Sequence, residues 1–456
     1  MWEPCSASRG VSPRVQGAHL PGSTFRGFAR PGGAEYLAAA PERGLGCPDP
    51  AGPQTEPERE NVEASTRSVS NAGLIRAILL GACVLPCASC APDQEGPEAV
   101  AEPLAVSLVG PLDPVGDEYF QATAAVVLAS GEVCVANASS GSVLRFDAHG
   151  RFEGAFGGVG DGPGEFRRLS WMGRYRGDSI ATYDGTLGRF TIFSGAGEVG
   201  RTVAVLRQQG ETRWRILGSD ADGGFIVQRH FERMEAEDQI RRDSISFIHL
   251  DARGRETHDL GHALGDEVFV RRGPGRTQVT EIHLPRPYGL RVSAAANGRH
   301  LVYPDGAGPN VRWVRSGDEG VQEDRPVPVS RVSLTSQELA DYMDAQLAAM
   351  APEARPQLRE LLESIPFPDR TPAFSALILD DADRIWAAAF REDGVPRNEW
   401  FIVHASEKAP QVIQLPAEVE LIATHPPYLV GLRVGPLGEE SVERWVVEGL
   451  EDLPPA

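Results

Sequence analysis

A glycine-rich stretch decides how this chain folds, and it reads Phe156-Gly157-Gly158-Val159-Gly160-Asp161-Gly162-Pro163-Gly164-Glu165-Phe166. An apolar segment that ends in a turn, Val143–Gly150, precedes it, and a second such segment, Gly177–Asp184, follows it. Glycine tolerates the positive φ angles of tight turns, and β-branched alternation favours strands. The stretch is therefore predicted to link two groups of antiparallel strands.

The same pattern recurs beyond residue 100 as a polar turn, an apolar strand, a spacer, a second apolar strand and a turn with Gly or Asp. Six units follow it: 124–136 with 143–150, 177–184 with 189–193, 222–227 with 246–254, 297–303 with 311–314, 383–388 with 400–404, and 428–432 with 442–447. Units of about 40–60 residues with about four strands each are typical of propeller blades. A strand at Leu104–Val109 is expected to close the last blade against the first. The sequence predicts an all-β fold, a six-bladed β-propeller over 103–452.

The stretch 156–166 resembles the G-x-G-P-G-x-F linker between the blades of NHL-repeat propellers and of six-bladed propeller lipoproteins of bacterial envelopes. The segments Val143–Gly150 and Arg189–Phe193 resemble the outgoing blade edge of the same families. The resemblance covers about residues 104–450 and is most specific over 124–205. It implies a fold and not an activity, because propellers include hydrolases, lyases and binding modules.

One segment departs from the strand pattern and is predicted to be a helical hairpin at 335–365, inserted between the fourth and fifth blades. Thr335 and Glu338 form a capping box at its start. Apolar residues at helical spacing follow in two runs, which are Leu339, Tyr342, Met343, Leu347 and Met350, and then Leu358, Leu361, Leu362 and Ile365. The hairpin is expected to pack on the rim of the propeller, or else to act as a lid or a docking element.

The N-terminal part is predicted to lie outside the fold. Residues 1–70 are rich in Pro, Gly, Ser and Arg without apolar periodicity, which indicates disorder or an untranslated extension, with translation starting at Val62 or Val69. Residues 71–90 combine Arg76 with an apolar run that ends in small residues, the pattern of a secretory signal. Residues 91–102 then form a flexible acidic tether.

The end of this signal resembles the lipobox of bacterial lipoproteins, whose cysteine is lipidated. Ala88-Ser89 before Cys90 gives the first candidate, and Leu80-Gly81-Ala82 before Cys83 the alternative. The resemblance implies a propeller anchored to the cell envelope through a lipid on Cys90; plain export to the periplasm or outside the cell remains open. Cys134 is the one cysteine beyond this region and is expected to be a buried small hydrophobe.

Composition excludes two classes of function. The formal net charge is −20, whereas phosphate backbones require a basic face, so no nucleic-acid partner is expected. No apolar run reaches the length of a membrane-spanning helix, so membrane contact is expected through the lipid alone. We also expect a monomer.

A metal site is the main catalytic alternative. Propeller lactonases hold a divalent cation in the central channel with Glu, Asp and Asn side chains, and oxygen ligands of this kind suit calcium. The weak candidates here are Asn137, Asp184 and Asp305, each of which is more easily explained as a turn residue that caps a strand end. No complete ligand pattern is present, so no cofactor is expected, with calcium as the open alternative.

Other polar motifs favour ordinary structural roles. His258 and His262 have the spacing of a helical zinc pair, but neighbouring glycines argue against a helix and predict two loop histidines. His249, His300 and His404 stand near strand ends without an evident link. The arginine-rich segments 229–233, 239–243 and 271–272 are interleaved with acids and predict a solvated, mixed-charge surface, or else a modest anion site.

These observations favour a non-enzymatic binding scaffold for a protein, peptide or glycan of the cell envelope, shaped by the helical hairpin and by a long loop between Val227 and Ser246. No catalytic residue can be named from the sequence. The alternative is a calcium-dependent hydrolase or lactonase. A channel mouth lined by Arg and apolar side chains would favour binding, whereas convergent acids or histidines from several blades would favour the enzyme.

Overall fold

The computed structural model describes residues 103–113, 121–205, 211–231, 239–274, 279–316, 322–327, 329–391, 397–403 and 410–450. The chain divides into one unit of Met1–Tyr36 with Ala99–Ala456 and a second unit, Leu37–Glu98. All the described residues belong to the first unit. The predicted signal, the candidate lipidation residues Cys90 and Cys83, and the acidic tether lie outside the described residues.

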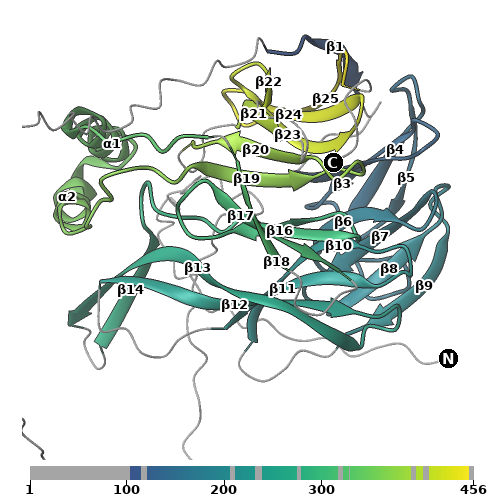
Figure 1. The fold of residues 1–456 in the computed structure, drawn as a ribbon, viewed down its shortest axis with the longest axis horizontal. Coiled ribbons are helices and arrows are strands. Elements are labelled where there is room, and N and C mark those ends of the chain that lie inside the picture. The colour runs from purple at the N-terminus through teal and green to yellow at the C-terminus, as the bar shows by residue number, and fades with distance from the viewer. Residues whose placement is uncertain are drawn as a thin grey trace, which may run out of the picture. The chain divides into compact units, whose positions relative to one another are not determined.

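The described residues form six antiparallel sheets (Figure 1). Sheet 1 contains β2 (Ala122–Val127), β3 (Val133–Asn137), β4 (Ser142–Phe146) and β5 (Phe152–Gly157), and sheet 2 contains β6 (Leu169–Tyr175), β7 (Ser179–Asp184), β8 (Arg189–Phe193) and β9 (Val199–Ala204). Sheet 3 contains β10 (Glu211–Ser219), β11 (Phe225–Phe231), β12 (Ile240–Leu250), β13 (Glu256–Pro274) and β14 (Val279–Pro285).

The remaining sheets follow in chain order. Sheet 4 contains β15 (Ala295–Ala296), β16 (His300–Pro304), β17 (Asn310–Arg315) and β18 (Gln322–Pro326), and sheet 5 contains β19 (Phe374–Leu379), β20 (Ile385–Ala389), β21 (Glu399–Val403) and β22 (Gln411–Gln414). Sheet 6 contains β23 (Val419–His425), β24 (Tyr428–Val434) and β25 (Glu440–Val447), and its fourth strand is β1 (Val106–Leu112).

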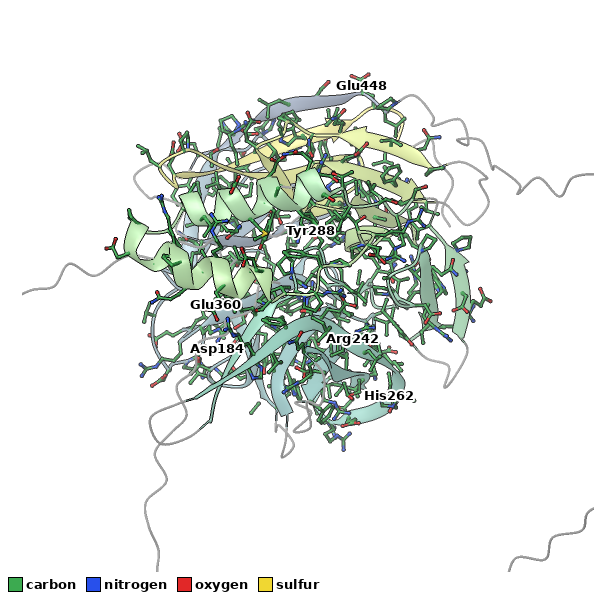
Figure 2. The ribbon with its side chains drawn as sticks, turned by 90° about the vertical axis from the view of Figure 1, so that its left-hand side faces the viewer. Asp184, Arg242, His262, Tyr288, Glu360 and Glu448 are labelled. Atoms are coloured by element: carbon green, nitrogen blue, oxygen red, sulfur yellow. The ribbon has the colours of Figure 1, made fainter. Side chains whose placement is uncertain are left out.

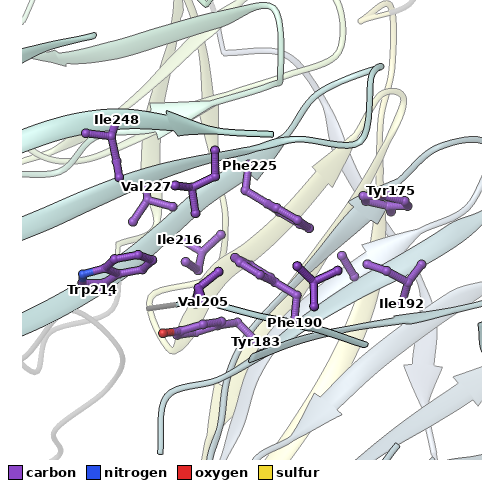
Figure 3. Close-up of a cluster of buried hydrophobic side chains, with 13 residues drawn as sticks. Tyr175, Tyr183, Phe190, Ile192, Val205, Trp214, Ile216, Phe225, Val227 and Ile248 are labelled. Atoms are coloured by element: carbon purple, nitrogen blue, oxygen red, sulfur yellow. The ribbon is translucent and has the colours of Figure 1, made fainter. Parts of the chain in front are cut away.

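Six hydrophobic cores join the sheets into a closed ring, each core lying between two successive sheets and the last between sheets 6 and 1. In the core between sheets 2 and 3, for example, Phe190 stacks on Phe225 with ring centroids 3.7 Å apart (Figure 3). The first strand of each sheet contacts the first strand of a neighbouring sheet, as β6 does with β2 and β10. These first strands therefore surround a central axis, and the predicted all-β propeller is confirmed.

The ring closes as predicted from the N-terminal strand. β1 pairs antiparallel with β25 and so supplies the outer strand of sheet 6. This pairing ties the start of the described chain to its end, which removes a free edge of the last sheet.

The glycine-rich stretch forms the linker between sheets 1 and 2, also as predicted. The backbone N–H of Gly158 donates to the carbonyl of Gly141 at 2.7 Å, and that of Phe166 donates to the carbonyl of Gly158 at 2.7 Å. Gly157 has φ of 95°, and a Cβ there would lie 2.9 Å from the Gly141 oxygen. Arg189 fixes the loop by donating to three of its carbonyls, and Phe166 is buried in the core beneath.

The helical insertion is confirmed between sheets 4 and 5. α1 (Ser336–Ala348) begins at the capping box of Thr335 and Glu338, and a short 3₁₀ turn (Pro352–Ala354) leads into α2 (Arg355–Glu363). The predicted apolar face packs on sheet 3, where Leu347, Leu362 and Ile365 surround Phe269 of β13. The helices thus rest on a long extension of β12, β13 and β14 (Figure 1).

The prediction of a long loop between Val227 and Ser246 is largely wrong. β11 continues to Phe231 and β12 begins at Ile240, with Phe231 paired to Ser244. Charged residues interrupt the alternation of apolar and polar residues that is typical of strands. Because their side chains form ion pairs and hydrogen bonds, the backbone ladder continues through them. This extension is what supports the helices.

Candidate functional site

The two ends of the central axis carry different side chains. We call the end at which the first strands begin the arginine mouth, defined by Arg213, Arg215 and Arg397. We call the end at which the first strands turn back the bridged mouth, defined by Arg174, Asp381 and His425.

The arginine mouth is built on the alternation of β10. Trp214 and Ile216 point into the core between sheets 2 and 3, so Arg213 and Arg215 lie on the other face of the strand. The Arg215 side chain is half-buried, and no hydrogen bond or ion pair joins its guanidinium to any residue in the described part of the chain. Burial lowers the pKa of Arg215, and so do the nearby charges of Arg213 and Arg397, against the opposing charge of Asp266.

A small pocket at this mouth combines guanidiniums with aromatic rings, and its lining includes Tyr288, Arg291, Ser375, Phe390 and Arg397. Arg397 donates to Glu420 at 2.8 Å through Nη1, whereas its Nε–H is buried without an acceptor among the described residues. Tyr288 has φ of 55°, an unfavourable conformation for a side chain of this size. Strained backbone of this kind clusters at functional sites.

The helical hairpin lies beside this pocket. The ring centroids of Tyr342, on α1, and Tyr288 are 5.5 Å apart, and those of Tyr288 and Phe390 are 6.3 Å apart. Arg286 donates to the carbonyl of Pro366, just after the hairpin, at 2.8 Å. Figure 2 shows Tyr288 near the middle of the ring, next to the two helices. The insertion therefore covers one side of the arginine mouth.

Two buried polar residues, Gln228 and His230 of β11, lie opposite Arg213 and Arg215 on the neighbouring strand. In the β10–β11 pairing, Arg213 faces His230 and Arg215 faces Gln228. The Gln228 Nε2 lies 2.8 Å from His230 Nε2, while Gln228 Oε1 has no donor among the described residues. Burial lowers the pKa of His230 to about 3, with the charges of Arg213 and Arg215 acting in the same direction, so His230 is neutral at pH 7.

The bridged mouth is closed by a charge cluster. Arg174 of sheet 2 donates to Asp381 of sheet 5 at 2.5 Å, and these sheets are opposite each other in the ring. His425 Nδ1 lies 3.1 Å from both the Asp381 carboxylate and the Arg174 guanidinium. The hydrogen bond with His425 lowers the pKa of Asp381, and Arg174 adds to the effect. The cluster therefore crosses the axis.

The three candidate metal residues lie at the ends of second strands in three sheets. Asn137 ends β3 and is buried, and Asp305 follows β16 with Arg312 at 3.5 Å. Asp184 ends β7, and its carboxylate accepts four backbone N–H groups, those of Arg167, Arg168, Thr186 and Leu187. Within the described residues, no group of three or more His, Cys, Asp or Glu side chains could hold a metal ion. The calcium site stays an untested prediction.

The structure places the remaining sequence candidates as follows. His258 and His262 lie on strand β13 and not in a loop, and His262 pairs with Asp259 at 3.0 Å. His249 Nε2 lies 2.5 Å from Asp220 Oδ2, and its Nδ1 lies 2.5 Å from Thr257 Oγ1. His300 pairs with Asp383 at 2.9 Å, whereas His404 lies outside the described residues. Cys134 is buried and free, as predicted, and burial raises its pKa to about 12.

The prediction of a solvated surface is wrong for part of the arginine-rich segments. Arg229 is buried and pairs with Glu256 at 2.9 Å, and Arg241 is largely buried beside Asp243. Arg271 reaches Glu360 of α2 at 2.5 Å. Arg229 thus links β11 to β13 and Arg271 links β13 to α2, whereas Arg241 and Asp243 pair within β12.

Sequence reasoning did not name the residues of the arginine mouth. Arg213 and Arg215 alternate with Trp214 and Ile216, and this period of two indicates a strand with one charged face. That signal was available in the sequence. The sequence did not indicate that Arg213 and Arg215 lie at the same end of the axis as Arg397, because the two segments come from different sheets.

No known protein family and no curated protein sequence matches this chain. Solved structures do resemble it. A Bacteroides fragilis protein provisionally described as exported has 10% identity and a TM-score of 0.43, over 76% of this chain and 95% of that one. Regucalcin, a calcium-binding protein of Agrobacterium tumefaciens, has 12% identity and a TM-score of 0.38, over 76% and 97%.

Virginiamycin B lyase of Staphylococcus aureus has 9% identity and a TM-score of 0.35, over 75% of this chain and 99% of the lyase. With TM-scores below 0.5, these proteins identify neither a ligand nor an activity for this chain. No helix among the described residues is long and apolar enough to cross a membrane.

Proposed function

We propose that this protein is a lipid-anchored propeller of the cell envelope that holds a protein, peptide or glycan at the arginine mouth, as a binding scaffold without catalysis. The six described sheets would be its complete set of blades. The helical hairpin would form one wall of the binding face.

The observation that carries the proposal is the lack of partners at the arginine mouth. A half-buried guanidinium is costly unless hydrogen bonds and an opposite charge compensate for its desolvation. Arg215 has no hydrogen bond or ion pair among the described residues, and the like charges of Arg213 and Arg397 oppose the one opposite charge, that of Asp266, that acts on it. A ligand would supply the missing acceptors. The rings of Tyr288 and Phe390 would add apolar contact, in the manner of interface hot spots.

The chemistry of these side chains supports binding over catalysis. A guanidinium stays protonated at neutral pH and has no lone pair to act as a base or a nucleophile. Ser375 at the same pocket donates its hydroxyl to the carbonyl of Ala389 at 3.1 Å, so its proton is already engaged within the protein. The side chains of this mouth can orient and hold an anion.

The proposed localisation to the cell envelope rests on the sequence. Arg76, the apolar run after it and Ala88-Ser89-Cys90 have the composition of a lipoprotein signal. Expressed in a bacterium with radiolabelled palmitate, the full chain is expected to incorporate label. Cys90→Ser should abolish the labelling and Cys83→Ser should not. The reverse pattern would assign the lipid to Cys83, and an unlabelled wild type would contradict lipidation.

The binding face can be tested by photo-crosslinking in the native envelope. We expect benzoylphenylalanine at Phe390, in the pocket, to give an adduct of defined mass. The same substitution at His149, an exposed residue on a turn between β4 and β5, should give none. Adducts from both positions would indicate nonspecific contact, and an adduct from His149 alone would move the binding face to the other end.

A further inference from the structure

An aspartate, a histidine and a threonine form a chain of hydrogen bonds on sheet 3, at the end where β10 turns back into β11. His249 Nε2 lies 2.5 Å from Asp220 Oδ2, and His249 Nδ1 lies 2.5 Å from Thr257 Oγ1. The side chains of Asp220 and His249 are only 13% and 14% exposed, whereas Thr257 is exposed. A hydroxyl within reach of an imidazole that a third group orients is the arrangement of an activated nucleophile.

The two contacts of His249 determine which of its ring nitrogens carries the proton. An ionised carboxylate can only accept, so Nε2 must donate its proton to Asp220. In a neutral imidazole the other nitrogen, Nδ1, then has a lone pair, and it accepts from the Thr257 hydroxyl. His249 is thereby placed to take the proton of Thr257 as a base.

The turn after β10 holds Asp220 in position. The backbone N–H of Gly224 donates to Asp220 Oδ1 at 2.7 Å, which leaves Oδ2 for His249. Burial acts to raise the pKa of Asp220, but the hydrogen bonds with His249 and Gly224 outweigh it and lower the pKa. A Cβ at residue 224 would lie 2.6 Å from both Asp220 Oδ2 and His249 Nε2, so the contact between these side chains requires glycine here.

A β-bulge places Thr257 beside His249. In the pairing of β12 with β13, Leu250 lies opposite Glu256. His249 lies opposite His258, so Thr257 has no partner residue on β12. A bulge redirects a side chain and is common beside active sites. His258 Nδ1 lies 3.0 Å from the same Thr257 oxygen, to which it can donate while the hydroxyl proton points at His249.

We infer that Thr257 is a nucleophile that accepts an acyl group from an activated ester, with His249 as its base and Asp220 as the residue that positions His249. Thr257 Oγ1 forms a bond to the carbonyl carbon, and the hydroxyl proton passes to His249 Nδ1. The alcohol or phenol of the ester leaves with that proton, so the products are an ester of Thr257 and a free alcohol or phenol. This single transfer to the chain goes beyond the proposed function, since it takes place at the end of sheet 3 away from the arginine mouth.

A competing hydrogen bond involves the same hydroxyl. Thr257 Oγ1 also lies 3.2 Å from the backbone carbonyl of His249, to which it can donate. Nδ1 of His249 would then have to donate to Thr257 while Nε2 donates to Asp220, which requires a positively charged imidazole. Thr257 would have no base in that arrangement, and it would react no faster than any other exposed threonine.

The test uses the full-length protein with p-nitrophenyl acetate as the acyl donor. We expect one acetyl group on Thr257, located by peptide mass spectrometry, and none on Thr202, an exposed threonine of β9. Thr257→Val should abolish this adduct, and Thr257→Ser should keep it. Lys408 is the one lysine of the chain, so few amines compete for the reagent.

Rates of acetylation test the two other residues. His249→Ala should slow the acetylation of Thr257 at least about tenfold, and added imidazole should restore part of the rate, which a merely structural histidine would not allow. Asp220→Asn should also slow it, and Asp220→Glu, which restores the carboxylate, should recover part of the rate. Acetylation of Thr257 at the rate of Thr202, or an unchanged rate in His249→Ala, would overturn the inference. The crosslink from Phe390 would still decide the proposed function, because it does not involve these residues.

Discussion

The two mouths of this propeller use the same residue types with opposite results. At the bridged mouth, the side chains of Arg174, Asp381 and His425 satisfy one another across the axis. At the arginine mouth, Arg215 has no hydrogen bond or ion pair among the described residues, and the charges that act on it are those of two arginines and one aspartate. The first arrangement stabilises the ring, whereas the second costs stability in the absence of a ligand. A protein tolerates such a cost where function requires it.

The largest effect is expected in the turn that supports the bridged mouth. Asp380 is buried and accepts from Arg384 Nε at 2.7 Å and from Trp386 Nε1 at 2.9 Å. Asp380→Ala leaves the Arg384 charge buried without its partner and should lower the free energy of unfolding by about 3–5 kcal/mol. Urea denaturation of the full-length protein measures this change.

Asp381→Ala is the matched control for that substitution. Asp381 is the next residue, and its side chain is 58% exposed, so its ion pair with Arg174 should contribute at most about 1 kcal/mol. Equal losses in the two variants would show that the turn as a whole, and not the buried charge of Arg384, determines the stability of this end.

The second prediction compares one arginine from each mouth. Arg215→Met removes an unpartnered guanidinium and keeps much of the side-chain volume, so the ligand-free protein should become more stable by about 0.5–2 kcal/mol. Arg174→Met removes a paired guanidinium and should destabilise the protein by up to about 1 kcal/mol. Opposite signs in urea denaturation would support the contrast. A loss in both variants would mean that Arg215 has a structural role.

Much of the fold could be predicted because the second strands of the sheets are covered on both faces. Val133–Asn137 and Ile385–Ala389 are nearly continuous buried runs, which sequence patterns reveal. The first strands do not show such runs. β6 contains Ser170, Gly173 and Arg174 between its core residues: Leu169 and Met172 pack in the core with sheet 1, Tyr175 packs in the core with sheet 3, and the positions between them are half-buried.

The site could be predicted less well, for a topological reason. Each sheet presents only a few residues to a mouth, so a site forms from segments far apart in the sequence. Arg174 and Asp381 meet across 207 positions. The capping box at Thr335 and the linker at 156–166 were predictable because their interactions are local. The sign of the charge at each mouth depends on contacts between sheets, which spacing along the chain does not encode.

The smallest expected effect is a pH dependence confined to the bridged mouth. The hydrogen bond with His425 and the charge of Arg174 hold the pKa of Asp381 below that of an unfolded chain, about 3.9. A carboxyl group with a lowered folded-state pKa stabilises the protein above its unfolded pKa, and this contribution is lost as the pH falls through the folded-state value. Asp381→Asn should therefore be less stable than wild type at pH 7, with a difference that shrinks below about pH 4.

Denaturation of both proteins between pH 7 and pH 2.5 measures that difference. Arg299→Gln is the graded comparison, since Arg299 pairs with Asp383 at 3.1 Å and helps to lower the pKa of both Asp381 and Asp383. It should lose part of the acid-sensitive stability while Asp381 stays able to titrate. A gap between Asp381→Asn and wild type that stays constant down to pH 2.5 would mean that the carboxylate charge contributes nothing. The bridge would then act through packing alone, and the electrostatic contrast between the two mouths would rest on the arginine mouth only.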